Sequence, residues 1–135
     1  MMTIRQQIDK FLSSPSFGVV GASANRAKYG NKVLRCYQQN GKKVVPVNPV
    51  ESEIEGLPCV SNVSDLPAEV KSISMITPPA VTSQLVPLAI ARGIENIWMQ
   101  PGAEDPAAVA LCREHGINVI ADGNCVLVVL GYHDH

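Results

Sequence analysis

The sequence predicts an α/β fold, in which one mainly parallel sheet of about five strands has helices on both faces. Short apolar runs alternate along the chain with segments whose apolar residues recur at helical spacing. Three predicted helices end at a glycine, at Gly41, Gly93 and Gly116, and a predicted strand follows within a few residues. Right-handed crossovers between such strands give three layers and a doubly wound, Rossmann-like sheet.

The first predicted element is a helix at 4–12. Thr3 and Gln6 form the capping-box pattern that begins many helices. Pro15 lacks the N–H that a further helical turn would need, so the helix is expected to stop before it. The inward face is expected to carry Ile4, Ile8, Phe11 and Leu12.

Each predicted strand is a short run of apolar residues. They are expected at 17–21, 44–47, 73–76, 97–99 and 119–121. The first is apolar throughout and enters a glycine turn, which is typical of a strand buried on both faces. Pro46 lies within the second, and because proline cannot donate to a ladder, this strand is expected to be short or to end there.

Three further helices are predicted from apolar spacing and end signals. One covers 31–40, one contains Pro87, and one covers 106–115 after the acidic cap Asp105 and Pro106. Pro87 should bend its helix or remove a hydrogen bond. The inward-facing residues are expected to be Val33, Leu34, Tyr37, Val81, Leu85, Leu88 and Ala89.

The remaining segments have no clear periodicity. Glycine, proline and scattered polar residues over 51–67 indicate a loop with one turn of helix. The chain is expected to be one domain, 1–135, in which 1–14 holds the N-terminal helix and 126–135 is a C-terminal tail. Val128 and Leu130 of that tail are expected to be exposed, where they could support a homodimer or a partner contact.

Composition and charge exclude several classes of protein. With 46% hydrophobic and 17% charged residues, the chain is too apolar to be disordered. A net charge of −1 gives no basic surface for nucleic acid, although a few local donors could still hold a small anion. The longest apolar run, 126–130, is far shorter than the roughly 20 residues of a membrane span. Without a signal-peptide pattern either, a cytoplasmic location is expected.

Cysteine and histidine spacing indicates no metal site. The four cysteines are Cys36, Cys59, Cys112 and Cys125, and no two form a Cys-x-x-Cys pair. Most are expected to be buried thiols. His133 and His135 lie in the tail, where residues are usually mobile. No metal ligand and no catalytic residue is therefore predicted.

Four short motifs follow the first four predicted strands. In an open parallel sheet, ligands bind beyond the carboxyl ends of the strands, near the point where the strand order reverses. Loops that follow parallel strands meet at this edge. The motifs are Gly21-Ala22-Ser23, Asn48-Pro49, Thr77-Pro78-Pro79 and Gln100-Pro101-Gly102.

The glycine turn after the first strand is a candidate phosphate site. Gly21 lets the backbone approach a phosphate closely, and the Ser23 hydroxyl can add a donor. Arg26 and Lys28 follow the turn and could neutralise phosphate charge, although a solvated loop would carry the same cations. We expect Gly21→Val to block binding without unfolding the protein, because the new side chain would take the place of the phosphate.

A nicotinamide dinucleotide is a less favoured ligand. The Gly-x-Gly-x-x-Gly fingerprint is missing, since counting from Gly21 places Ser23 and Arg26 where glycines belong. Such sites also carry an acidic residue after the second strand to bind the ribose. Here Asn48-Pro49 stands in that place, and ordinary turn chemistry would also explain this pair.

Taken in order, these motifs resemble the small stand-alone CoA-binding-domain proteins, which are similar to the N-terminal domain of the succinyl-CoA synthetase alpha subunit. The resemblance extends over roughly 15–125. The stretches that carry it are Val19-Val20-Gly21-Ala22-Ser23, Val44-Val45-Pro46-Val47-Asn48-Pro49, Ser64-Asp65-Leu66-Pro67, Thr77-Pro78-Pro79 and Ile97-Trp98-Met99-Gln100-Pro101-Gly102.

The resemblance implies a Rossmann-like fold that binds coenzyme A or an acyl-CoA. It implies that the Gly21-Ala22-Ser23 turn meets the phosphates. It places Asn48-Pro49 and Thr77-Pro78-Pro79 around the nucleotide end, and Gln100 to Gly102 nearer the pantetheine arm.

This chain departs from the family pattern at two places. Synthetase-type domains carry a lysine soon after the strand-two motif, where this chain has Val50-Glu51. Stand-alone members commonly carry Asp-Arg-Cys after strand five, where this chain has Asp122-Gly123-Asn124-Cys125. The phosphorylated histidine of the synthetase belongs to a second domain, so CoA binding without catalysis is expected.

Two alternatives stay open from the sequence alone. One is an NAD(P)-binding redox-sensing module, which the fold allows. The other is a thiol-dependent enzyme that uses Cys125, the one cysteine expected near a strand's carboxyl end.

Overall fold

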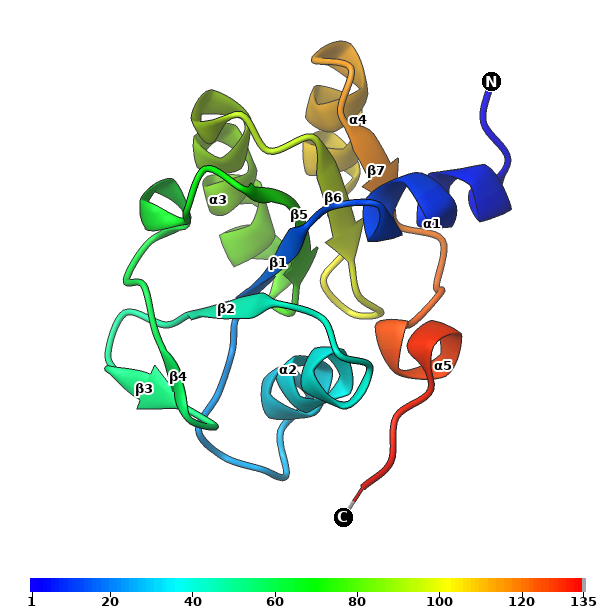
Figure 1. The fold of residues 1–135 in the computed structure, drawn as a ribbon. Coiled ribbons are helices and arrows are strands. Elements are labelled where there is room, and N and C mark those ends of the chain that lie inside the picture. The colour runs from blue at the N-terminus through cyan, green and yellow to red at the C-terminus, as the bar shows by residue number, and fades with distance from the viewer. Residues whose placement is uncertain (135) are drawn as a thin grey trace.

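The computed structural model describes residues 1–134 and contains one five-stranded parallel sheet with helices on both faces (Figure 1). The sheet has the strand order β2-β1-β5-β6-β7. Its strands are β1 Ser16–Val20, β2 Val44–Val47, β5 Val70–Met75, β6 Asn96–Met99 and β7 Asn118–Ile120. The predicted α/β, Rossmann-like fold is confirmed.

Within residues 1–134, five α-helices cover the two faces of this sheet. They are α1 Ile4–Leu12, α2 Tyr29–Gln39, α3 Pro79–Arg92, α4 Pro106–Glu114 and α5 Val126–Leu130. One buried cluster unites residues of α3 and α4 with the sheet, and a second unites residues of α1, α2 and α5 with its other face. No helix within 1–134 is both long and apolar enough to cross a membrane.

The strand order reverses between β1 and β5. The chain enters the sheet at β1, next to the edge, runs outward to β2, then returns to β5 and continues outward on the other side. Val20 lies opposite Val47 on one side and Met75 on the other, so three strands end together. The loops after β1 and β5 therefore leave from neighbouring positions at the point where the order reverses.

Pro46 lies inside β2, opposite Val19 of β1, and does not end the strand. β2 is at the edge of the sheet. The Pro46 carbonyl accepts a hydrogen bond from Val60 N at 3.0 Å, away from β1. Because the N–H and C=O groups of one strand residue face the same side, the donor that proline lacks would also have faced away from β1.

Aromatic side chains fill the core on the α1 and α2 face. Phe11 meets Trp98 edge to face with ring centroids 5.2 Å apart, and Phe17 stacks on Tyr37 at 5.0 Å. The Trp98 indole donates a hydrogen bond to Asn124 O at 2.9 Å, so its single polar group is satisfied. This packing seats α2 against β1.

Expectations for two segments need correction. The buried residues of α3 are Thr82, Val86 and Ala89, whereas Leu88 is 44% exposed. Because 81–90 is apolar on more than one side, its spacing did not determine which stripe faces the sheet. The 51–67 stretch holds the expected short helix, but also a two-stranded hairpin. These elements are β3 Glu53–Ile54, β4 Leu57–Pro58 and the 3-10 turn Val63–Asp65.

The segment expected to be a tail forms α5, which packs on α2. Val126 is fully buried and Leu130 is half-buried, so the expectation of an exposed Leu130 is wrong, whereas Val128 is 81% exposed. The nearby helix α2 supplies the apolar surface that five isolated residues could not supply for themselves. His135 lies outside the described residues.

The raised pKa values of two buried thiols predict how the stability of the fold depends on pH. Burial raises the pKa of Cys36 from 9.0 to about 11 and that of Cys112 from 9.0 to about 11. Between these values the unfolded chain releases thiol protons that the folded chain retains, so stability falls as the pH rises. We expect the free energy of unfolding to decrease above about pH 9, by up to about 1.4 kcal/mol per pH unit for each thiol.

Urea unfolding at about pH 8, 9 and 10 measures this slope. Cys112→Ala should be less stable at every pH but should show a shallower loss above about pH 9. An equal slope in the variant and the wild-type protein would show that Cys112 does not contribute.

Candidate functional site

Three hollows adjoin one another at the carboxyl ends of the strands, and we call them together the strand-end crevice. The first, of about 430 Å³, lies against the glycine turn and the start of α2. The second, of about 290 Å³, lies between the ends of β1 and β2 and the start of α3. The third, of about 250 Å³, lies between the loops that follow β5 and β6. Shared lining residues join them: Gly21, Ala22, Tyr29, Asn48, Ile76 and Thr77.

Most of the predicted site residues line this crevice. They are Gly21, Ala22, Ser23, Lys28, Asn48, Pro49, Thr77, Pro78 and Gly102. Arg26, Pro79 and Gln100 do not line it. Pro79 is the first residue of α3, and Gln100 is fully buried beneath the surface.

Gly21 lies in a gap that fits no side chain. Its φ is +93°, and a Cβ there would lie 2.1 Å from the carbonyl oxygen of Ile76. On the other side, a Cβ at Gly30 would lie 2.1 Å from the carbonyl oxygen of Gly21. The expectation that Gly21→Val would leave the fold intact is therefore wrong, because the valine would collide with the backbone that follows β5.

The amino terminus of α2 faces the first hollow. Lys28, Tyr29 and Gly30 all line it. Lys28 is the N-cap residue, and no side chain caps the helix. The first N–H groups of a helix lack partners within the helix, and the helix dipole makes this end favourable for an anion. The hollow therefore has the features of an anion site.

The side chain of Asn48 joins two loops of the crevice. Its amide nitrogen donates to Ala22 O at 2.9 Å, and its amide oxygen accepts from the backbone N–H groups of Val50 and Glu51 at 2.8 Å each. The turn chemistry expected of Asn48-Pro49 is thus present, and it also fixes the glycine turn. Across the crevice, Thr77 shares a 2.6 Å hydrogen bond with the Thr82 hydroxyl in the first turn of α3.

Tyr29 connects the crevice with a buried polar cluster. Its hydroxyl donates to Gln100 Oε1 at 3.3 Å, and it hydrogen-bonds the Cys125 thiol. The same Gln100 oxygen accepts from Val126 N at 2.9 Å. Burial raises the pKa of Tyr29 well above its usual value, and the hydrogen bond to Cys125 adds to this. Tyr29 is therefore neutral at physiological pH.

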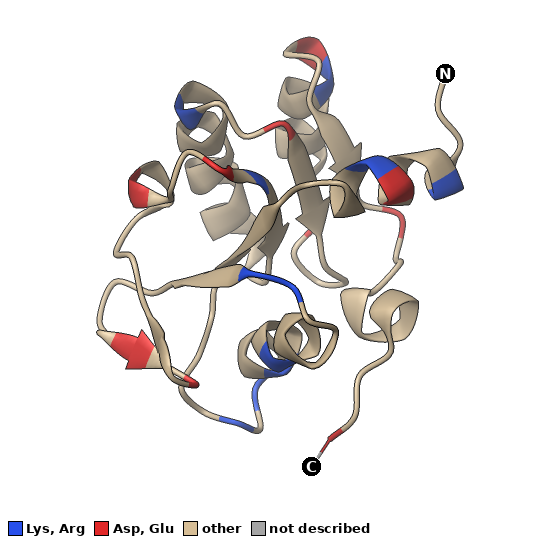
Figure 2. Cartoon of the chain, viewed as in Figure 1, with Lys and Arg blue, Asp and Glu red and all other residues tan. Residues whose placement is uncertain are grey.

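The charges around the crevice are uneven. Lys28 is the only charged residue among the described residues that line its three hollows. The Arg26 guanidinium lies 3.6 Å from the Glu55 carboxylate, and Lys32 lies 3.8 Å from Asp134. Figure 2 shows these basic residues along α2 and the loop that leads into it.

Several lining residues were not predicted from the sequence. They are Tyr29, Gly30, Ser61, Asn62, Val63, Ile76, Val81, Leu85 and Ala103. Gly30 could have been predicted, because a glycine at the start of a helix after a β-α turn indicates close packing. Ser61 and Asn62 come from the irregular stretch, where no sequence pattern predicts a site.

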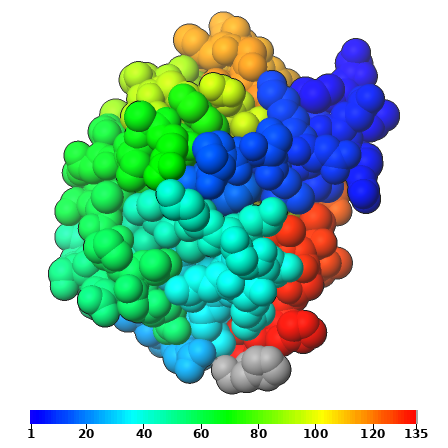
Figure 3. Space-filling model, in the orientation of Figure 1, coloured from blue at the N-terminus to red at the C-terminus, as the bar shows by residue number. Residues whose placement is uncertain are grey.

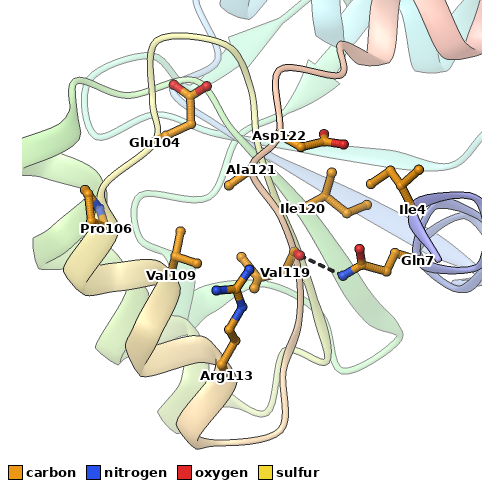
Figure 4. A pocket seen from close by; sticks show the side chains of 10 residues that line it. All are labelled: Ile4, Gln7, Glu104, Pro106, Val109, Arg113, Val119, Ile120, Ala121 and Asp122. Carbon is orange, nitrogen blue, oxygen red and sulfur yellow. Dashed lines mark hydrogen bonds between the residues drawn. The ribbon is translucent and has the colours of Figure 1, made fainter. Parts of the chain in front are cut away.

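A separate pocket of about 460 Å³ lies along the edge strand β7, between α1 and α4 (Figure 4). Val109 and Arg113 line it from α4, and Ile4 and Gln7 line it from α1. The Gln7 amide donates to Val119 O at 2.9 Å, which covers part of the open strand edge. No predicted site residue lines this pocket. Within the described residues, no group of three or more His, Cys, Asp or Glu side chains could hold a metal ion.

Comparison with known proteins identifies the family. Residues 15–131 match the model of the CoA binding domain. The chain belongs to the CoA-binding domain family. The resemblance indicated by the strand-end motifs is therefore confirmed.

Relatives of this CoA-binding domain include both ligases and small proteins. It is 25% identical over 130 residues to the ADP-forming acetate–CoA ligase II subunit alpha of Pyrococcus furiosus, covering 88% of this chain and 28% of the ligase subunit. It is 25% identical to the uncharacterized protein YneT of Bacillus subtilis, covering 81% of each. The domain thus spans less than a third of the ligases it matches.

The solved structures that superimpose on this chain likewise include a protein of similar length and a much longer synthetase. A conserved hypothetical protein from Pyrococcus furiosus superimposes with a TM-score of 0.81 at 38% identity, covering 84% of this chain and 97% of that one. An acetyl-coenzyme A synthetase from Candidatus Korarchaeum cryptofilum, solved with phosphate and ADP, superimposes with a TM-score of 0.72 at 26% identity. That match covers 81% of this chain and 26% of the synthetase.

The confined position of Gly21 predicts a loss of stability on substitution. Gly123 is a matched control because its φ is +91°, close to the +93° of Gly21, while a Cβ there would meet nothing within 4 Å. We expect Gly123→Ala to cost about 1–2 kcal/mol, the strain of a left-handed alanine. Gly21→Ala should cost at least about twice as much, since it adds a backbone collision. Urea unfolding of both variants measures the difference, and equal costs would contradict it.

Proposed function

We propose that this chain binds coenzyme A or an acyl-CoA in the strand-end crevice and performs no chemistry on it. The observation that carries this proposal is the 430 Å³ hollow formed by the glycine turn and the uncapped start of α2. Membership of the CoA-binding domain family supports the identity of the ligand.

The diphosphate of CoA suits the first hollow. Gly21, Ala22 and Ser23 line this hollow, and their small size lets a phosphate approach the backbone of the turn closely. Lys28 and the first amides of α2 then offer positive charge and hydrogen-bond donors. An exposed cation near backbone donors suits a solvated diphosphate better than a neutral ligand.

The other two hollows suit the two ends of CoA. Val20, Val47 and Val63 give the 290 Å³ hollow apolar walls, which fit a flat base such as adenine. Thr77, Asn48, Ser61 and Asn62 add polar groups there. The 250 Å³ hollow, lined by Tyr29, Pro101 and Gly102, is open to a thin chain such as pantetheine.

Two observations favour CoA over NAD(P). The side chain of Asn48 already accepts two backbone hydrogen bonds and donates one, so it does not replace the acidic residue that binds a nicotinamide ribose. The nearest acid along the chain, Glu51, is exposed and does not line the crevice within the described residues.

The proposal of binding without catalysis rests on which side chains line the crevice. Its described lining residues include no histidine, carboxylate or cysteine that could act as acid, base or nucleophile. Cys125 is hydrogen-bonded to Tyr29, a neutral phenol that cannot serve as a base. We further propose a reducing, cytoplasmic location, which the four free thiols support.

Calorimetric titration with CoA, acetyl-CoA, NAD and NADP tests the ligand. We expect heat of binding with CoA and acetyl-CoA and none with the dinucleotides. Lys28→Gln should weaken CoA binding by about three- to tenfold, through loss of one charged phosphate contact. Lys42→Gln is the matched control, because Lys42 is a partly exposed lysine just before the opposite end of β2. A response to NAD alone would overturn the proposal.

Alkylation of Cys125 tests the absence of a thiol mechanism. Burial raises the pKa of the Cys36 and Cys112 thiols to about 11 each, so neither should react with iodoacetamide near pH 8. We expect the protein labelled at Cys125 to retain CoA binding within about threefold. Turnover of an acyl-CoA that disappears on labelling, and in Cys125→Ser, would show an enzyme instead.

A further inference from the structure

A buried cation lies behind the loop that joins β1 to α2, which we call the β1–α2 loop and define as residues 21–28. Arg35, in the second turn of α2, is only 5% exposed. It does not line the strand-end crevice, so it is not a phosphate ligand. A guanidinium is costly to bury, so its partners identify the structure that it supports.

Arg35 makes two hydrogen bonds that lead to the β1–α2 loop. Its Nε donates to Asn31 Oδ1 at 2.6 Å, and its Nη2 donates to the backbone carbonyl of Arg26 at 2.9 Å. Asn31, which is fully buried, then donates from Nδ2 to the carbonyl of Ser23 at 2.9 Å. Two carbonyls of the loop are thus held, one directly and one through Asn31.

Fixing these carbonyls fixes the loop's amides. A trans peptide is planar, so anchoring the oxygen of Ser23 or Arg26 also sets the direction of the N–H group that follows it. The Asn31 amide also donates to Glu55 Oε2 at 3.1 Å, and Glu55 pairs with Arg26. The hairpin of β3 and β4 therefore holds the same loop from outside.

The outer side of Arg35 faces the C-terminal segment, which lies against α2 (Figure 3). Its Nη1 lies 3.5 Å from the Asp134 carboxylate, and its guanidinium lies over the Tyr132 ring, 5.4 Å from the centroid. The Asp134 side chain is 64% exposed, so this pair is screened by water and contributes little. On the loop side, the bond from Arg35 to Asn31 is buried, and the bonds to the carbonyls of Arg26 and Ser23 are part-buried.

We infer that Arg35 is a positioning residue, which acts through Asn31 and the Arg26 carbonyl to hold the β1–α2 loop in the shape that receives the CoA diphosphate. The inference rests on the proposed function. Lysine cannot replace Arg35 here, because one ammonium nitrogen cannot reach both acceptors with the fixed fork of a guanidinium.

The first measurement needs no ligand. Backbone ¹⁵N relaxation of the free protein gives order parameters for residues 22–28 in the wild-type protein, Arg35→Lys, Asn31→Asp and Asp134→Asn. We expect values near about 0.85 in the wild-type protein and in Asp134→Asn, and below about 0.6 in the other two. Asn31→Asp keeps the acceptor for Arg35 but loses the donor to Ser23, so it tests the same connection if Arg35→Lys does not fold.

The second measurement separates positioning from general damage. Arg35→Lys should weaken CoA binding by about tenfold, while Asp134→Asn should stay within about twofold. Pantetheine, which lacks the diphosphate, should shift the amide signals of Gly102 and Ala103 equally in the wild-type protein and Arg35→Lys. If Arg35→Lys lost affinity for CoA and for pantetheine by the same factor, the inference would be overturned.

The two measurements distinguish the two proposals. Unchanged order parameters in Arg35→Lys and Asn31→Asp would overturn the role of Arg35, even if the wild-type protein binds CoA. A wild-type protein that binds no CoA, with order parameters that fall as expected, would overturn the proposed function and leave the anchoring of the loop established.

Discussion

The arrangement of the whole site depends on one close backbone approach, at Gly21. Its α-carbon is so near the carbonyl of Ile76, and its own carbonyl so near Gly30, that neither glycine has space for a methyl group. These contacts bring the end of β1, the loop after β5 and the start of α2 to one place. The helix terminus is thereby held against the strand ends, and the crevice lies around this junction.

Around this junction, the protein separates the groups that hold the loop from the groups that remain open. Asn48, Asn31 and Arg35 direct their polar atoms to loop carbonyls and are largely buried. Lys28 and the uncapped amides of α2 remain at the surface of the crevice. A preformed anion site needs both sets, because a flexible loop would lose conformational entropy when a ligand ordered it.

Sequence patterns predicted the parts of the structure that depend on local chemistry. The strands, the Thr3 cap, the Asp105 cap and the co-location of Gly21, Asn48 and Thr77 follow from periodicity, turn chemistry and the rule for parallel sheets. Long-range packing could not be predicted in the same way. The stripe of α3 that faces the sheet, and the confinement of Gly21 by Ile76, depend on which atoms arrive from distant segments.

The C-terminal residues illustrate a practical consequence of this packing. Tyr132 and Asp134 lie on Arg35, close to the loop at the crevice, whereas the N-terminus lies on the far side of the molecule, beside β7 (Figure 1). An affinity tag or a surface linkage attached at the C-terminus would crowd α2 and distort any titration. Purification tags and biosensor immobilisation are therefore better placed at the N-terminus.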